Sequence, residues 1–245
     1  MIKLIILQML LIPFIATGES LYEGSSDKKS GDTAIIITKC EDFEVSGDGS
    51  AESWNKTEWI NIPQRVEKPD IYTTRAKVLY SETGIYFLFE CEDKILTTTM
   101  KEDYLNLYEE DVVEVFLWTE EDFPLYFEYE ISPLNYELPI MIPNYNGNFF
   151  GWLPWHYEGD RKTTHATSSI GGKKKPGASV EAWLAEFFIP YKLLAPLPQV
   201  PPKPGTKWRA NMYRIDYDQG QTPFSWQKTS GSFHEYDKFG TFIFE

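Results

Sequence analysis

The chain has 245 residues and a formal net charge of -14 at neutral pH. This length is enough for one domain with a sizeable core. The acidic charge argues against nucleic acid and anionic membranes as partners, because both attract basic surfaces. The three histidines and two cysteines form no cluster with zinc-ligand spacing.

Residues 1–18 have the pattern of a secretory signal peptide. Lys3 gives a basic start, an apolar run covers residues 4–15, and small residues end at Gly18, near which cleavage is expected. No later stretch reaches the ~18 apolar residues that a membrane-spanning helix needs. We therefore expect an exported protein, periplasmic or secreted, without a membrane span and with a flexible polar lead-in over residues 19–32.

Residues 33–245 read as one domain of short strands separated by turn signals. Strands are predicted at residues 33–39, 76–80, 84–91, 108–118, 125–132, 183–190, 209–217 and 239–244. Helical periodicity is almost absent, with one candidate turn near residues 191–194. This pattern is typical of an all-β protein. We predict an antiparallel β-sandwich of two sheets, jelly-roll-like or immunoglobulin-like, with one long aromatic loop over residues 133–177.

Cys40 and Cys91 are the two cysteines of the chain. An exported protein can form disulfides, so a single bridge between them is allowed. The sequence leaves open whether the two side chains meet.

Glu114 lies in the middle of the predicted strand 108–118. Side chains alternate along a strand, so Glu114 shares a face with Phe116, whereas Val113 and Val115 point the other way. An ionised carboxylate among rings is costly unless it is paired. Rings with one placed acceptor are also how proteins hold sugars. The alternative is a glutamate on an edge strand that faces water.

Several motifs, taken in order, resemble family 9 carbohydrate-binding modules, part of the wider DOMON-like group of β-sandwich sugar and haem binders. These motifs are Trp54 after a Gly-Asp-Gly turn, a strand pair ending at Asp93, the segments 111–116, 126–130 and 186–190, Trp226, and Phe239-Gly240. The resemblance spans about residue 33 to the C-terminus. It implies a β-sandwich that binds sugar and has no catalytic activity.

The resemblance also implies a clamp for a terminal sugar, formed by two aromatic side chains. The matching positions are Tyr108, three residues before the Asp of the D-x-V-E strand, and Phe233, six residues before the final Phe-Gly. Glu114 is the strand glutamate that accepts from sugar hydroxyls. Sugar-binding members of the family carry tryptophan at both aromatic positions. At ~25 cal/mol per Å2, the smaller rings lose contact worth of order 1 kcal/mol, which predicts weaker or altered binding.

Three further residues are candidates for the sugar site. Glu130 is not among them, because it stands where some relatives bind sugar through a basic residue and its charge is opposite. Arg214 is a candidate to counter Glu114 or Glu130 and hold it ionised, and a purely structural salt bridge is the favoured interpretation. Trp152 and Trp155 of the long loop either stack on glycan or pack the loop onto the sandwich.

Structural calcium is a candidate because the resembled family often carries it and hard oxygen ligands suit it. The loop acids that could serve are Asp48, Asp93, Asp103, Asp216 and Asp218. No EF-hand-like spacing is present, and solvated surface acids are the alternative.

The expected function is binding of oligosaccharide or polysaccharide chain ends, for instance plant-type glycans such as xylan, beside a glycoside hydrolase. The first alternative is a degenerate sandwich for protein contacts at the cell surface. The second is a glycoside hydrolase that uses strand carboxylates, for which the candidates are Glu114, Glu128, Glu130 and Glu186. The third is a haem binder with a Met/His pair. Its candidates are His156, His165, His234, Met100, Met141 and Met212.

Overall fold

The computed structural model describes residues 33–146 and 148–245. The predicted signal peptide and lead-in, residues 1–32, lie outside the described residues. Within the described part of the chain, no helix is both long and apolar enough to cross a bilayer.

The described chain is built mainly of β-strands joined by short helical turns. The strands are β1 (Ala34–Lys39), β2 (Ile60–Asn61), β3 (Thr74–Tyr80), β4 (Gly84–Glu92), β5 (Val112–Trp118), β6 (Leu125–Ile131), β7 (Glu137–Tyr145), β8 (Asn148–Phe149), β9 (Leu153–Pro154), β10 (Thr164–Ile170), β11 (Ala182–Pro190), β12 (Lys207–Asp216), β13 (Thr222–Ser225) and β14 (Gly240–Phe244). The helical turns are η1 (Glu52–Lys56), η2 (Leu107–Glu109), η3 (Gly159–Arg161), α1 (Tyr191–Leu194) and η4 (Tyr236–Lys238).

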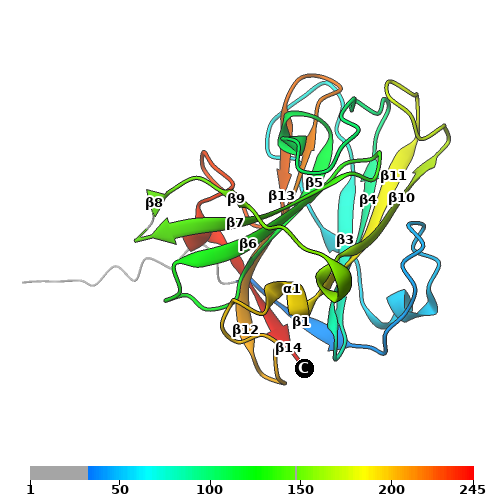
Figure 1. The fold of residues 1–245 in the computed structure, drawn as a ribbon. Helices are drawn as coiled ribbons and strands as arrows, with labels where there is room; N and C mark the ends of the chain where they lie inside the picture. The colour runs from blue at the N-terminus through cyan, green and yellow to red at the C-terminus, as the bar shows by residue number, and fades with distance from the viewer. Residues whose placement is uncertain (1–32, 147) are drawn as a thin grey trace, which may run out of the picture.

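The strands form the two sides of a sandwich (Figure 1). One sheet, here called the β5 sheet, has the order β14-β12-β5-β6-β7, with β13, β8 and β9 at its margins. The other, the β4 sheet, has the order β10-β11-β4-β3, with β2 beside β3. Strand β1 connects them, because its first part pairs in parallel with β14 and its last two residues pair with β3. The predicted all-β sandwich is confirmed.

The main core lies between the sheets. Val113 and Val115 of β5 belong to the same buried cluster as Phe87 and Phe187 of the β4 sheet. The two phenylalanine rings stack with their centroids 5.2 Å apart. Phe116, on the opposite face of β5, belongs to a second buried cluster on the outer side of the sheet. The alternation predicted for residues 112–118 is therefore confirmed, and β5 separates two apolar layers.

The predicted strands correspond to β1, β3, β4, β5, β6, β11, β12 and β14, and the predicted turn to α1. Strand β5 begins at Val112 and not at Tyr108 as predicted, because Leu107–Glu109 form the turn η2. The prediction of one loop over residues 133–177 is wrong, because β7 pairs along its length with β6 and β10 pairs with β11. Pro139 and Pro143 gave the misleading loop signal. Both lie in β7, where their carbonyls accept from the amides of Trp155 and Phe150. Proline is tolerated there because only short segments pair on that margin.

Glu186 of β11 anchors the loop that precedes η1. Its buried carboxylate accepts from the Gly47 amide at 2.7 Å, from Trp54 Nε1 at 2.9 Å, and from Ser46. Gly47 has a φ of +85°, and a Cβ there would lie 2.8 Å from the backbone of Ala166. The Gly-Asp-Gly turn and the tryptophan after it are thus anchored to the β4 sheet through Glu186.

Cys40 and Cys91 are both free and buried. They belong to different hydrophobic clusters, so the bridge that the sequence allowed is not formed.

Candidate functional site

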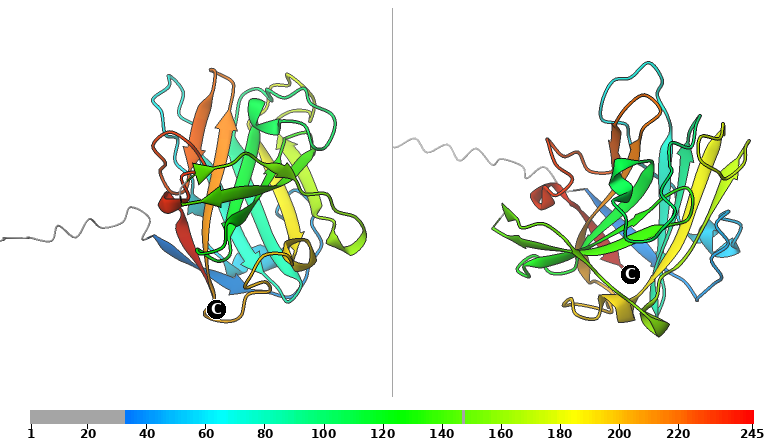
Figure 2. Two further views of the ribbon diagram at one scale, coloured as in Figure 1. Left: turned by 60° about the vertical axis from the view of Figure 1, so that its left-hand side comes forward. Right: turned by 45° about the horizontal axis from the view of Figure 1, so that its top comes forward.

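A cavity of about 790 Å3 lies on the outer face of the β5 sheet. Its lining includes Tyr108, Glu114, Phe116, Glu128, Glu130, Ile140, Phe149, Trp152, Phe233 and His234. Glu114 of β5 and Glu128 and Glu130 of β6 supply its carboxyl groups, and we call these three side chains the floor of the cavity. Residues 228–234, in the connection to β14, line it from another side. In Figures 1 and 2 this connection runs beside the end of β7 near β8, at the same end of the β5 sheet.

Tyr108 and Phe233, far apart in the sequence, line this same cavity. Tyr108 sits on η2, where its backbone carbonyl accepts from the Tyr217 hydroxyl at 2.8 Å. Phe233 stacks on the buried ring of Tyr213, and the Tyr213 hydroxyl donates to the Phe233 carbonyl at 2.8 Å. Both cavity side chains remain partly exposed. The structure therefore presents two aromatic surfaces, each fixed by a tyrosine, to one space.

The floor of the cavity carries three glutamates. Glu114 of β5 lies directly opposite Glu130 of β6, and Glu128 lies two residues before Glu130 on the same face. Their exposed fractions are 2%, 0% and 4%, respectively. Within the described part of the chain, neither oxygen of Glu130 nor Oε2 of Glu128 has a hydrogen-bond partner of ordinary geometry. Three carboxyl groups this close and this buried cannot all be ionised cheaply.

Burial is the main cause of the raised pKa of each floor glutamate. It raises the pKa of Glu114 to about 8. The pKa of Glu128 is raised well above its usual value by burial and then by Glu114. The pKa of Glu130 is raised well above its usual value by burial and then by the other two carboxyl groups. At neutral pH the floor therefore holds protons, and a protonated carboxyl can both donate to and accept from a sugar hydroxyl.

His234 forms part of the wall above the floor. Its Nδ1 lies 2.6 Å from the Tyr126 hydroxyl and 3.9 Å from Oε2 of Glu128. Its ring stacks on Phe149 and Phe116, with centroids 4.2 Å and 5.3 Å apart. Burial lowers the pKa of His234 to about 4. The imidazole is therefore neutral at neutral pH and does not balance the charge of Glu128.

Sequence reasoning did not assign His234 or Phe149 to the sugar site. The position of His234 directly after Phe233 was a usable signal. Phe149 gave none, because it enters the cavity through β8, inside the segment that was predicted to be loop.

The two loop tryptophans have different places. Trp152 lines the cavity and packs against the outer cluster of the β5 sheet. Trp155 packs against the core between the sheets, and its Nε1 donates to the Leu193 carbonyl at 3.0 Å. Trp155 does not line the cavity, so the packing alternative holds for it and the sugar-contact prediction does not.

Arg214 lies outside the cavity. It is fully buried, and its Nη2 lies 3.1 Å from Oδ2 of Asp93 and 2.6 Å from Oδ2 of Asp216. Its Nη1 donates to the Thr74 hydroxyl at 3.0 Å. These contacts tie the end of β12 to the strands of the β4 sheet.

The predicted pairing of Arg214 with Glu114 or Glu130 is wrong, for a reason of register. Tyr213 lies opposite Glu114 and shares its outward face, whereas Arg214 lies opposite the inward-facing Val113. The arginine is one residue out of phase with the cavity. The alternative reading, a structural salt bridge, describes what the structure shows.

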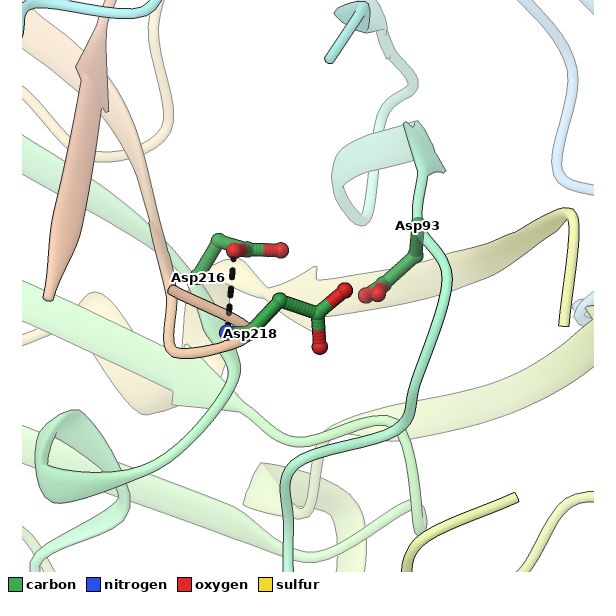
Figure 3. A group of neighbouring side chains, drawn as sticks. All are labelled: Asp93, Asp216 and Asp218. Atoms are coloured by element: carbon green, nitrogen blue, oxygen red, sulfur yellow. Dashed lines mark hydrogen bonds between the residues drawn. The ribbon is translucent and has the colours of Figure 1, made fainter. Parts of the chain in front are cut away.

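Three of the proposed calcium ligands come together. Carboxylate oxygens of Asp93, Asp216 and Asp218 lie within 4.8 Å of one another, at the ends of β4 and β12 (Figure 3). Asp48 and Asp103 lie elsewhere, bonded to Ser46 and to the amide of Glu137. Asp93 and Asp216 are buried, so they are not the solvated surface acids of the alternative reading.

The aspartate cluster already contains a cation. Oδ2 of both Asp93 and Asp216 binds the Arg214 guanidinium, and Oδ1 of each accepts a backbone amide. Both oxygens of Asp218 accept as well, from Thr97 and from Tyr72 among others. Because every carboxylate oxygen has a donor, the arrangement fits an ion-pair network and does not fit a calcium cage.

The haem alternative lacks a suitable pair in the cavity. Among the described residues that line it, His234 is a histidine and none is a methionine. Met141 and Met212 lie in the core between the sheets, on the other side of β5 from His234. His165 is engaged with Asn135 and Glu137.

Comparison with known proteins agrees with the fold and with the sequence motifs. Residues 45–140 match the model of the family described as carbohydrate family 9 binding domain-like. The resemblance indicated by the sequence motifs is thereby confirmed. No curated protein matches the chain.

Solved structures share the fold at low sequence identity. A candidate carbohydrate-binding protein from Bacteroides uniformis has a TM-score of 0.69 and 18% identity, over 88% of this chain and 100% of that one. A family 9 carbohydrate-binding module from Caldicellulosiruptor kristjanssonii, in complex with cellotriose, has a TM-score of 0.63 and 15% identity, over 87% and 94%. Its complex with glucose has a TM-score of 0.62 and 15% identity, over 87% and 96%. At these identities the likeness establishes a common fold.

Proposed function

We propose that this protein binds the terminal sugar of an oligosaccharide or polysaccharide and carries out no reaction on it. The observation that carries the proposal is the meeting of Tyr108, Phe233 and Glu114 around one cavity. The family match, and the structures of similar fold that hold cellotriose and glucose, support a sugar as the ligand.

The cavity offers the two kinds of contact that sugar binding needs. Partly exposed rings at Tyr108 and Phe233 can cover the C–H faces of a pyranose, each contact contributing about 0.5 to 1.5 kcal/mol. Glu114 can exchange hydrogen bonds with hydroxyls, at about 1 kcal/mol net for each. Trp152 adds a further aromatic surface to the same cavity. Contact free energies of this size predict a modest affinity for the sugar. Binding of this kind requires no bond cleavage.

The position of the carboxyl groups argues against hydrolysis. Glu114, Glu128 and Glu130 all project from one face of two neighbouring strands. A glycosidase needs two carboxyl groups that flank the scissile bond about 5 to 10 Å apart, so that one acts as acid and the other from the opposite side. Groups that share one floor meet a sugar from one side only. Glu186, the fourth candidate, is enclosed by the Gly47 loop of the β4 sheet.

A second candidate function is the docking of a protein partner. It is favoured by apolar side chains near the cavity that are 46 to 64% exposed, namely Tyr145, Phe149, Phe150 and Leu153. Such side chains can also extend a glycan surface, so the two functions need a common test.

Calorimetric titration with cello- and xylo-oligosaccharides provides that test. Tyr108→Ala and Phe233→Ala should each weaken sugar binding about two- to tenfold, the effect of losing one ring contact. Ile170→Ala is the control, because this exposed apolar side chain belongs to β10 of the other sheet and does not line the cavity. Sugar binding that is unchanged in both cavity variants, or absent in the native protein, would contradict the proposal and favour the docking function.

We also propose export after cleavage near Gly18, and action beside a glycoside hydrolase. The basic and apolar start of the chain supports export. Determining the N-terminal sequence of the protein recovered from outside the cytoplasm tests it, and an intact Met1 would refute it. The hydrolase partner is tested by adding a xylanase or cellulase and measuring whether the protein increases release of reducing ends from insoluble glycan.

A further inference from the structure

We propose that the cavity prefers a cationic sugar, one whose terminal unit carries a free ammonium group as glucosamine does, over a neutral sugar of the same shape. This inference rests on the proposed function and names the sugar class for that site. It is carried by the arrangement of charge and hydrogen-bond donors around the cavity floor.

Glu130 is the clearest pointer. Its side chain is fully buried, it lines the cavity, and neither of its oxygens has a hydrogen bond of ordinary geometry among the described residues, the nearby donors being the Tyr108 amide and the Glu128 carboxyl. A buried carboxyl without a partner is costly, and such groups in native structures call for an explanation. Oε2 of the neighbouring Glu128 lacks a donor as well. A ligand that brings hydrogen-bond donors to Glu128 and Glu130 would supply the well-aligned partners that the protein itself does not.

The cations that line the cavity do not balance the floor. They are Arg65 and Lys228. The guanidinium of Arg65 donates to Ser225 and to the Trp226 carbonyl. Lys228 lies exposed at the rim. No ion pair joins either of them to a floor carboxyl within the described structure, so no arginine or lysine pairs with the three acids where they converge.

An ammonium group can supply both hydrogen-bond donors and a positive charge to the floor carboxyl groups. It carries three donors and a full positive charge, whereas each hydroxyl carries one donor and no charge. Charge-assisted hydrogen bonds are about twice as strong as neutral ones. The aromatic walls at Tyr108, Phe233 and Trp152 select for a ring-bearing ligand. A bare metal ion does not match, because the described acids with the spacing for one ion are the aspartates around Arg214, outside the cavity.

Protonation links the floor to the charge of the ligand. Burial raises the pKa of Glu114, Glu128 and Glu130, and repulsion from neighbouring carboxyl groups raises the pKa of Glu128 and Glu130 further, so the free cavity holds protons at neutral pH. The other ionisable groups that line it are Tyr108, His234, Arg65 and Lys228, and Tyr126 and Tyr213 lie buried beside the floor glutamates. Of these, the phenols and the imidazole are neutral at that pH. A bound ammonium would lower the pKa of the carboxyl groups and expel protons, and a neutral sugar would not.

The experiment is calorimetric titration at neutral pH with short oligomers of glucosamine, of N-acetylglucosamine and of glucose, each in two buffers that differ in ionisation enthalpy. Glucosamine oligomers should bind about tenfold tighter than the other two, the size of one charge-assisted hydrogen bond. Their binding alone should release protons. Glu130→Gln, which keeps the shape of the side chain, should remove most of the preference.

Glu121→Gln is the matched control, because Glu121 is an exposed acid in the turn after β5 that does not line the cavity. It should leave the preference unchanged. Equal affinity for glucose and glucosamine oligomers would overturn this inference and leave the proposed function standing. If Glu130→Gln and Glu121→Gln reduced the preference for glucosamine oligomers equally, the overall charge of the protein would explain that preference. This result would also overturn the inference. If no oligomer binds, the proposed function itself fails.

Discussion

Phe233 lies flat on Tyr213, with ring centroids 4.0 Å apart and planes 13° apart. Tyr213 in turn lies opposite Glu114 in the β12–β5 pair. Tyr213, a residue of the β5 sheet, therefore positions the Phe233 ring and also lies beside Glu114 on the cavity floor. Through this contact the sheet fixes the position of the Phe233 ring, although Phe233 belongs to the segment that connects β13 to β14.

Replacing Tyr213 should disturb the wall and the stability together. Tyr213→Leu removes a fully buried ring and the surface on which Phe233 rests, at a cost of about 2 to 4 kcal/mol in unfolding free energy. Tyr213→Phe keeps the stack and loses the bond to the Phe233 carbonyl, at about 1 kcal/mol. Urea unfolding measures both. Sugar affinity should drop clearly for the leucine variant and little for the phenylalanine variant, and the reverse order would contradict this role.

Stability should fall as the pH rises from about 5 to about 9. Burial raises the pKa of Glu114 to about 8 and that of Asp111 to about 9. In this interval the folded protein keeps protons that the unfolded chain has released, so deprotonation favours unfolding. Glu114→Gln and Asp111→Asn should each flatten the curve of unfolding free energy against pH. A native-protein curve that rises over this interval would contradict the protonated floor.

Calcium chloride and EDTA should both leave the melting temperature unchanged. The oxygens of Asp93, Asp216 and Asp218 are already bound by Arg214 and by other donors. Differential scanning calorimetry in each solution gives the answer. A melting temperature that rises by several degrees with calcium and returns with EDTA would show that the ion displaces the guanidinium.

Arg214→Met should destabilise the fold and spare the sugar site. Removing one partner from a buried ion pair costs about 3 to 5 kcal/mol, because Asp93 and Asp216 would keep uncompensated charge. Urea unfolding measures the loss. Sugar affinity at a temperature where the variant is folded should equal that of the native protein, since Arg214 does not line the cavity. A selective loss of affinity with unchanged stability would reverse this assignment.

Much of the fold could be predicted because its signals are local. The alternation around Glu114 and the short turn between β3 and β4 depend on residues next to one another in the chain. Strand β7 was missed because Pro139 and Pro143 are loop signals in sequence, and they are tolerated only through pairing at a sheet margin. That context is tertiary, and the sequence does not display it.

The site was predictable in part for the same reason. The motif resemblance identified Tyr108 and Phe233, whose meeting in one cavity depends on the path of the whole chain. Arg214 was misplaced because only the register of β12 on β5 decides which face it shares. The sequence left the role of Trp155 open, because a tryptophan ring in a loop can use the same face to stack on a ligand or to pack against the core.

The most direct test of the account is a crystal structure of the protein soaked in a mixture of glucose, xylose, glucosamine and cello-oligosaccharides. We expect a terminal sugar between Tyr108 and Phe233, with hydroxyl or ammonium groups within hydrogen-bond distance of Glu114 and Glu130. A sugar bound elsewhere on the sandwich, with both rings free of contact, would contradict it.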